Sequence, residues 1–320
     1  MRINSAIAIV LAFSIFVSCR DKAADKTDYI ITEKDLIPEG VAFDAQTQTI
    51  YIGSTHKRKI ISISKEGKVT DFIKEAQDDI KSVIGMEVDS ITRSLWAVSS
   101  EANEVLPLIN PGNDQWKSSI FQFRLDNGKL RKKYRLNKDS VFLNDLTVAS
   151  DGSVYITESI GKSIYKIIPG ADTLQLFMKI TSYQFINGIS FSDIPDRIFA
   201  TSTEGIISIN LQSKEYSLLP AAAGCVAGSI DGLAFHKNYF IAHQSSRILR
   251  FYLSEKRDSI ISCDTLDNGK EFDSSTTGEV SGNYYYYIVN SQIQSGVNYE
   301  NQMIKPHDSL ENIIIRKIKL

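Results

Sequence analysis

The sequence predicts an all-β fold, a six-bladed β-propeller, because one strand pattern recurs six times with nearly constant spacing. Each copy is a short alternating apolar strand, a polar turn, and a second strand rich in β-branched and aromatic residues. The third residues of the triplets that begin these copies are at positions 40, 86, 145, 188, 232 and 278. Their intervals of 46, 59, 43, 44 and 46 residues each suit one four-stranded blade.

Additional strand pairs between these copies complete the predicted blades. They are expected at 60–64 with 68–73, at 119–125 with 129–136, and at 164–168 with 173–178. We expect the ring to close through a strand near 29–31 beside the C-terminal strand at 312–320. The longest interval is explained by an insertion at 101–116, which contains Pro107, Pro111 and Gly112. Loops of this length are often lids, so we expect the insertion to overhang the channel mouth.

The N-terminal residues have the features of an export signal. Arg2 precedes an apolar run at 7–17, which is too short to remain as a membrane-spanning helix. The run ends in Phe16-Val17-Ser18-Cys19, which resembles a bacterial lipobox. We therefore expect residues 1–18 to be a lipoprotein signal peptide, Cys19 to be lipidated, 19–28 to be a charged tether, and 29–320 to be the propeller. An ordinary signal peptide is the alternative.

The same features predict a location in the cell envelope, on the periplasmic side or at the outer membrane. Membrane contact is expected through the lipid anchor alone, and the propeller is expected to be a monomer. The formal net charge of −2 gives no basic footprint for nucleic acid. In an exported protein Cys225 and Cys263 could pair, or could be two separate small apolar residues.

The repeat places six equivalent positions around one mouth of the channel, namely Glu39, Gly85, Asn144, Asn187, Asp231 and Thr277. The ends of the second strands are expected to add His56, Glu158, Glu204, His243 and Asn290 on the same face. Two carboxylates and two amides are hard oxygen donors that suit a divalent cation, Ca²⁺ best. The alternative is that these residues only form turns, because Asn-Gly and Asp-Gly are common turn dipeptides.

Four of the blade starts resemble those of the gluconolactonase/regucalcin family, and more distantly those of paraoxonase. They are Pro38-Glu39-Gly40, Asn144-Asp145, Asn187-Gly188 and Asp231-Gly232. The resemblance covers essentially the whole chain after the tether. It implies that Glu39, Asn187 and Asp231 hold a divalent metal, often calcium, and that Asn144 contacts metal or substrate. Sugar-lactone hydrolases of the family often carry an arginine where this chain has Phe142, which implies a more apolar ligand.

These observations together predict a metal-dependent hydrolase of a small lactone or ester. We expect Asp231 or His243 to accept a proton during catalysis, and Asn144, Phe142 and Glu158 to contact the substrate. A non-catalytic propeller that binds a ligand or partner around a structural metal is the alternative, because propellers serve both purposes.

If Cys19 carries the lipid, Cys19→Ala should move the protein from the detergent phase to the aqueous phase in a phase-partitioning assay, or leave the precursor uncleaved. The reason is that the thiol is the only site in the lipobox to which the lipid attaches. Unchanged partitioning of Cys19→Ala would show that the lipobox interpretation is wrong.

Overall fold

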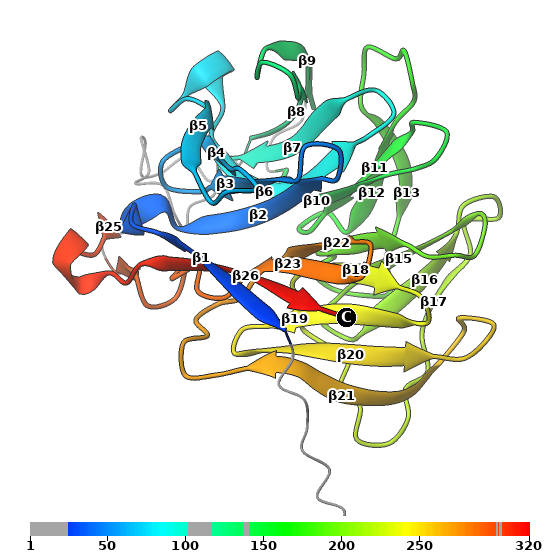
Figure 1. The fold of residues 1–320 in the computed structure, drawn as a ribbon. Coiled ribbons are helices and arrows are strands. Elements are labelled where there is room, and N and C mark those ends of the chain that lie inside the picture. Colours follow the sequence, from blue (N-terminus) through cyan, green and yellow to red (C-terminus); the bar gives the residue numbers. More distant parts are fainter. Residues whose placement is uncertain (1–24, 102–116, 137–140, 299, 301–302) are drawn as a thin grey trace, which may run out of the picture.

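The computed structural model describes residues 25–101, 117–136, 141–298, 300 and 303–320. In these residues the chain forms six four-stranded antiparallel sheets and one two-stranded sheet (Figure 1). The innermost strand of each four-stranded sheet contacts that of the next sheet, and the last contacts the first. The six sheets therefore form a closed ring, and the predicted six-bladed propeller is confirmed.

The first three blades are meanders in which consecutive strands pair in chain order. Blade one contains β2 (Pro38–Asp44), β3 (Thr49–Ser54), β4 (Ile60–Ile63) and β5 (Val69–Ile73). Blade two contains β6 (Ser82–Asp89), β7 (Ser94–Ser100), β8 (Ser118–Arg124) and β9 (Leu130–Arg135). Blade three contains β10 (Leu143–Val148), β11 (Val154–Glu158), β12 (Ser163–Ile167) and β13 (Gln175–Lys179).

The fourth and fifth blades have the same order, and the sixth combines both ends of the described chain. Blade four contains β14 (Ile189–Phe191), β15 (Arg197–Thr201), β16 (Ile206–Asn210) and β17 (Tyr216–Leu218). Blade five contains β18 (Leu233–His236), β19 (Tyr239–Gln244), β20 (Arg247–Leu253) and β21 (Ile260–Asn268). Blade six contains β22 (Gly278–Ser281), β23 (Tyr284–Ile288), β26 (Ile313–Lys319) and β1 (Lys26–Ile31).

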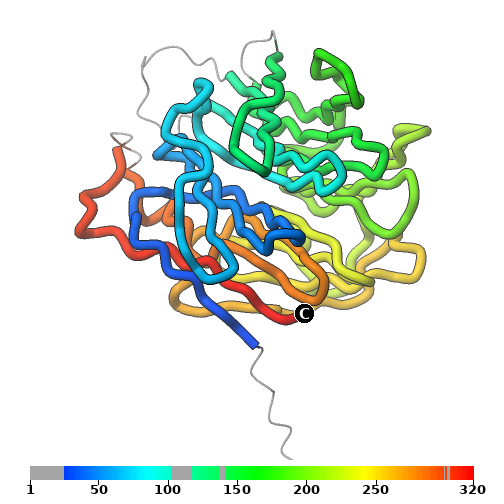
Figure 2. The backbone as a smooth tube through the Cα atoms, turned by 45° about the horizontal axis from the view of Figure 1, so that its top comes forward, coloured from blue at the N-terminus to red at the C-terminus, as the bar shows by residue number. Residues whose placement is uncertain are grey.

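The ring closes by the pairing of β1 with β26, as expected, and the two strands run side by side in Figure 2. The propeller begins earlier than the predicted boundary at residue 29. Lys26 to Asp28 belong to β1 and not to a free tether. Arg316 forms an ion pair with Asp28, with Nε 2.7 Å from Oδ1, and Lys26 pairs with Asp267. Residues with the composition of a solvated tether are thus fixed by charged side chains of two blades, Asp267 of β21 in blade five and Arg316 of β26 in blade six.

Apolar side chains pack between adjacent blades rather than inside single sheets. The run Tyr284–Tyr287 looks in the sequence like a strand with one core face and one surface face. In the structure Tyr285 and Tyr287 face the blade-five side and stack at 5.4 Å, whereas Tyr286 stacks on Phe43 of blade one at 4.2 Å. Both faces of this blade are therefore covered, because every sheet in a closed ring has a neighbour on each side.

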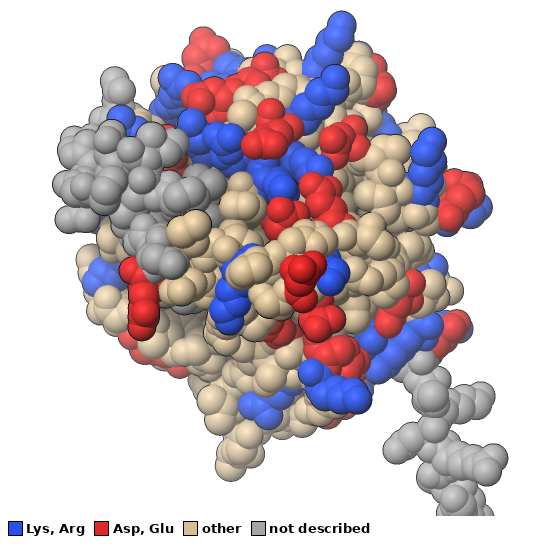
Figure 3. All heavy atoms as spheres, turned by 90° about the vertical axis from the view of Figure 1, so that its left-hand side faces the viewer, with Lys and Arg blue, Asp and Glu red and all other residues tan. Residues whose placement is uncertain are grey.

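Several smaller features complete the description. β24 (Val297–Asn298) pairs with β25 (Met303–Ile304), and the helical segments of the described chain are three 3₁₀ turns, η1 (Lys34–Leu36), η2 (Gln77–Asp79) and η3 (His307–Ser309). No helix in the described ranges has the length and apolarity needed to cross a bilayer. Acidic and basic side chains are interspersed over the face shown in Figure 3. The signal peptide, Cys19 and residues 102–116 of the insertion lie outside the described residues.

Cys225 and Cys263 form a disulfide, which the sequence left open. The bond joins residues 38 apart in the chain, and the Cα atoms are 5.8 Å apart. It attaches the loop that leads into blade five to β21, the outermost strand of that blade.

The glycines of the repeated triplets lie where neighbouring blades come closest together around the axis. A Cβ added at Gly40 would be 2.1 Å from the Ile84 carbonyl oxygen of blade two, and one at Gly232 would be 2.6 Å from the Thr276 oxygen at the start of blade six. The Gly232 N–H also donates to that Thr276 oxygen at 2.8 Å. At these positions only glycine leaves room for the adjacent backbone.

Replacement of Gly232 by alanine should therefore destabilise the whole ring, since the new methyl group meets backbone that cannot swing aside. We expect the free energy of unfolding in urea to fall by about 1–3 kcal/mol. Gly282→Asn is the control, because Gly282 has no atom near its added Cβ and asparagine tolerates its positive φ of 60°. Equal stability of Gly232→Ala and Gly282→Asn would contradict the crowding described above.

Candidate functional site

All six equivalent positions line one narrow throat on the propeller axis, including Gly85 and Thr277. The throat has a volume of about 10 Å³, room for one water-sized particle. It opens into a wider cavity of about 300 Å³. Four of the six positions also line this mouth cavity, and they are the four with oxygen-donor side chains, Glu39, Asn144, Asn187 and Asp231. The structure thus brings together the set of residues that the sequence predicted as ligands.

Hydrogen bonds fix the orientation of both amides. Asn144 Nδ2 donates to Ser159 Oγ at 3.0 Å, and Ser159 Oγ in turn donates to the Ile186 carbonyl oxygen at 2.7 Å. Asn187 Nδ2 donates to Asp231 Oδ1 at 2.8 Å. Because these bonds hold the nitrogen of each amide against the protein, the Oδ1 atom is the acceptor that each side chain can offer to a cation.

The two carboxylates come from well-fixed backbone. Asp231 precedes β18, its N–H donates to the His243 carbonyl oxygen at 3.0 Å, and its own carbonyl accepts from Gly188 N at 3.0 Å. Glu39 lies in β2, and its carbonyl oxygen accepts from Thr276 Oγ1 at 2.9 Å. These contacts link the blades that carry the donors, so the cavity has a preformed framework.

The donor set differs from a site rich in histidine or acidic residues. In the described ranges no three His, Cys, Asp or Glu side chains form a group that could hold a metal ion. A cation in the mouth cavity would therefore depend on the two amide oxygens as well as on the two carboxylates.

One side of the mouth cavity is aromatic. Phe142 and Phe185 both line it, and their ring centroids are 6.5 Å apart. Phe185 is 43% exposed, although burial is usual for phenylalanine. Glu158, which the sequence placed beside the substrate, is buried behind this side, and its Oε1 accepts from Phe142 N at 3.3 Å. Glu158 therefore positions the backbone of Phe142 and does not line the cavity.

His243 does not lie at the rim, where the sequence placed it as a proton acceptor. It is fully buried between blades five and six, with Nδ1 2.9 Å from Ser275 Oγ and Nε2 hydrogen-bonded to Tyr285 Oη. Burial lowers the pKa of His243 to about 3. β19 ends next to His243 as expected, but side chains alternate between the two faces of a strand, and at position 243 the side chain points into the interface between blades five and six.

The other second-strand residues also lie elsewhere. Asn290 is buried and binds the backbone at Asn312 and Ile314, and Glu204 lines a neighbouring groove. Instead, hydroxyl side chains line the mouth cavity, namely Thr55, Ser82, Ser202, Thr203, Ser229 and Ser245. Ser82 is completely buried, and its Oγ has no hydrogen-bond partner. Thr55, Ser202, Thr203 and Ser245 directly follow second strands, and this recurrence of Ser and Thr was the sequence signal for most of these residues.

The opposite end of the channel is acidic. Glu87, Asp145 and Glu279 line a second cavity of about 330 Å³. Burial raises the pKa of Glu87 to about 8 and that of Asp145 to about 7. Burial also raises the pKa of Glu279 well above its usual value, and the charges of Glu87 and Asp145 add to this effect. At neutral pH this end of the channel therefore retains protons.

Comparison with solved structures identifies other propellers of similar overall shape. Virginiamycin B lyase from Staphylococcus aureus is 17% identical, with a TM-score of 0.58 over 93% of this chain and 100% of that one. A gluconolactonase from Xanthomonas campestris is 14% identical, with a TM-score of 0.59 over 88% of this chain and 86% of that one. The fold is shared with gluconolactonases.

The fold is also shared with proteins of other kinds. A chain of a nidogen/laminin complex is 13% identical, with a TM-score of 0.56 over 75% of this chain and 83% of that one. No protein-family model and no curated protein sequence matches the chain. At these identities the similarity establishes the fold alone, so function has to be argued from the site.

The raised pKa values predict that stability decreases as the pH rises. A carboxyl group with a folded pKa above its unfolded value stabilises the protein below the unfolded pKa, and this contribution is lost as the pH rises through the folded pKa. Glu87→Gln keeps an oxygen for the Val148 N–H, which Glu87 accepts at 3.1 Å, but has no proton to lose. From pH 5 to pH 9 the free energy of unfolding should therefore decrease less in Glu87→Gln than in the wild type. We expect the two decreases to differ by at least about 1 kcal/mol.

The exposed Glu255 provides the control, and Glu255→Gln should follow the wild-type pH dependence. Urea unfolding at several pH values measures both variants. A Glu87→Gln curve parallel to the wild-type curve would contradict the protonated state of this carboxyl group.

Proposed function

We propose that the protein is a metal-dependent hydrolase of a small lactone or ester, with its active site in the mouth cavity. The observation that carries the proposal is the convergence of Glu39, Asn144, Asn187 and Asp231, from four different blades, on that one cavity. If these side chains served only to form turns, they would not be expected to direct oxygen donors into one shared cavity. The disulfide between Cys225 and Cys263 supports an exported location, because such bonds persist in oxidising compartments.

The donor set fits a hard divalent cation. Carboxylate and amide oxygens are the ligands that Ca²⁺ prefers, and it tolerates irregular geometry. The hydrogen bonds of Asn144 and Asn187 already direct their oxygens for such a role. Ca²⁺ held by the four side chains would polarise a substrate carbonyl and stabilise negative charge on its oxygen.

The chain's own residues supply the rest of the reaction. Asp231 accepts the proton of the attacking water, and the Asn187 N–H at Oδ1 holds its carboxylate in one orientation. The unpartnered Ser82 hydroxyl provides a hydrogen bond for a ligand in the cavity. His243 takes no part, because both ring nitrogens are hydrogen-bonded inside the blade interface.

The aromatic side of the cavity favours an apolar substrate. Phe142 and Phe185 offer ring faces where a polar sugar would need hydrogen-bond partners. An aliphatic or aromatic lactone or ester therefore suits this cavity better than an aldonolactone.

A non-catalytic binding propeller is the second candidate. Among the described residues that line the mouth cavity, Glu39 and Asp231 are the only side chains suited to accept a proton at neutral pH, and both are also the charged ligands. A site with no separate base is equally suited to hold a structural cation. Screening lactones and aryl esters in the presence of calcium distinguishes the two candidates, since only the hydrolase releases product.

Calcium should raise the melting temperature of the wild-type protein, and chelation should lower it, because the ion binds only the folded state. At a hundredfold excess over Kd the stabilisation is about 2.7 kcal/mol. Glu39→Ala and Asp231→Ala remove a charged ligand and should abolish the shift in a thermal unfolding assay. Thr277→Ala, at the equivalent position in blade six, should keep it. A wild-type melting temperature that is insensitive to calcium and magnesium would overturn the metal site.

Phe142→Arg should shift the preference of the enzyme toward polar lactones. The guanidinium group would bind sugar hydroxyls that the phenyl ring cannot, so the ratio of kcat/KM for gluconolactone to that for an aliphatic lactone should rise about tenfold, or 1.4 kcal/mol. Ile160→Arg adds the same charge at a half-exposed position that does not line the cavity, and should leave the ratio unchanged. An unchanged ratio in Phe142→Arg would mean that this ring does not select the substrate.

A further inference from the structure

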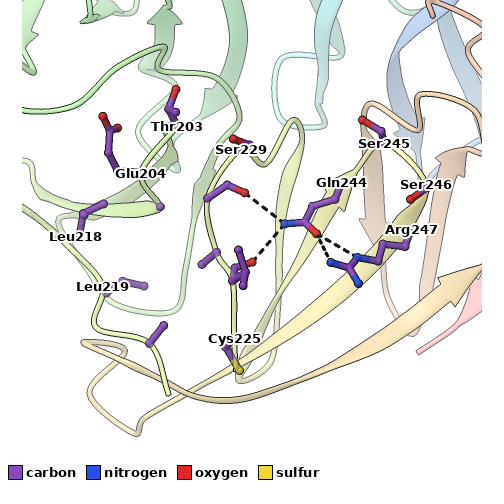
Figure 4. Close-up of a pocket in the computed structure, with 15 residues that line it drawn as sticks. Thr203, Glu204, Leu218, Leu219, Cys225, Ser229, Gln244, Ser245, Ser246 and Arg247 are labelled. Carbon is purple, nitrogen blue, oxygen red and sulfur yellow. Dashed lines mark hydrogen bonds between the residues drawn. The ribbon is translucent and has the colours of Figure 1, made fainter. Parts of the chain in front are cut away.

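A groove between blades four and five adjoins the mouth cavity on the same face of the propeller. It has a volume of about 770 Å³, and Thr203, Ser229 and Ser245 line both spaces. The mouth cavity of about 300 Å³ is at the lower limit for small-molecule sites, whereas the groove lies well within their range. In Figure 4 the three shared residues lie at one end of the groove, and Leu219 and Cys225 lie toward the other.

One wall of the groove is apolar. Leu218, Leu219 and Val226 line it together with the disulfide-bonded Cys225. Val226 is 67% exposed, which is unusual for a valine that lines a concave surface. Val226 continues the wall formed by Leu218, Leu219 and Cys225, and a contiguous apolar surface of this kind can mark a ligand-binding groove.

The loop that carries Val226 is fixed in place. The disulfide anchors it to β21, and two backbone hydrogen bonds of 2.8 Å join it to the same strand, from Ala222 N to Ile260 O and from Ile260 N to Pro220 O. Gln244 Nε2 donates to the Val226 and Gly228 carbonyl oxygens at 3.2 and 3.3 Å. The exposure of Val226 is thus built into a rigid wall, and a preformed wall lowers the cost of binding.

The Gln244 side chain on the polar wall is fully hydrogen-bonded within the protein. Arg247 Nε and Nη2 donate to Gln244 Oε1 at 3.1 and 3.0 Å, while Gln244 Nε2 makes the two bonds to the loop. Gln244 therefore uses both donors and both acceptor sites within the protein. A ligand lying along Gln244 meets a side chain with no remaining hydrogen-bonding capacity, which favours an apolar segment.

We propose that the groove binds an apolar acyl or alkyl arm of the substrate, whose ester or lactone group lies in the mouth cavity. This inference rests on the proposed function for the position of the reactive group. It extends that function by assigning the substrate class to amphipathic, long-chain esters or lactones rather than to small rings alone.

The test uses the full-length protein and p-nitrophenyl esters from acetate to decanoate. The ratio of kcat/KM for decanoate to that for acetate should exceed ten in the wild type. Val226→Asp, which places a charge on the apolar wall, and Ser246→Trp, which narrows the groove from the opposite wall, should each lower this ratio about tenfold through KM. Ile91→Asp is the matched control, because Ile91 is 75% exposed in the turn between β6 and β7, away from the groove.

Calorimetry with decanoate, corrected with protein-free blanks, separates failure of this inference from failure of the proposed function. If no ester is hydrolysed but decanoate binds and Val226→Asp weakens binding tenfold, the groove assignment is correct and the hydrolase is not. If esters are hydrolysed with a ratio and a decanoate affinity that both groove variants leave unchanged, the groove assignment is overturned and the hydrolase stands. Absence of both hydrolysis and decanoate binding would overturn both.

Discussion

The close approach of the six innermost strands around the axis is the constraint on which the rest of the structure depends. Gly40 and Gly232 lie against the backbone of the following blade, where an added Cβ would come within 2.1 and 2.6 Å of a carbonyl oxygen. The same approach lets Gly232 N donate to Thr276 O and lets Thr276 Oγ1 donate to Glu39 O. These glycines thus allow neighbouring blades to approach closely, and the residues just before them, Glu39 and Asp231, line the throat on the axis.

This convergence gives the two ends of the channel different chemistry. At one end Glu39 and Asp231 present two carboxylates, and Asn144 and Asn187 two oriented amides, to a cavity with an aromatic side. At the other end Glu87, Asp145 and Glu279 share a confined space, where burial raises the pKa of all three groups, that of Glu87 to about 8. The first arrangement suits binding of a cation beside an apolar ligand, whereas the second mainly makes stability depend on pH.

The repeat was sufficient to predict the blades, the closure by β1 and β26, and the four donors at the mouth, because each depends on a period that the sequence repeats. Features that depend on orientation across blade interfaces were not predictable. His243 ends its strand where expected, but its ring turns toward Ser275 and Tyr285. Lys26 and Asp28 resemble a solvated tether until Asp267 and Arg316 are brought beside them from far along the chain. The pairing of Cys225 with Cys263 likewise could not be decided without the distance between their Cα atoms, which is 5.8 Å in the structure.

The most direct test is a crystal structure of the protein grown with Mn²⁺ as an anomalously scattering substitute for Ca²⁺. We expect one anomalous peak in the mouth cavity, with carboxylate oxygens of Glu39 and Asp231 and the Oδ1 atoms of Asn144 and Asn187 within about 2.6 Å. Calcium added in excess should remove the peak by competition. An ordered structure in which the four side chains retain their positions around the cavity, yet no anomalous peak is present there at millimolar Mn²⁺, would contradict the account.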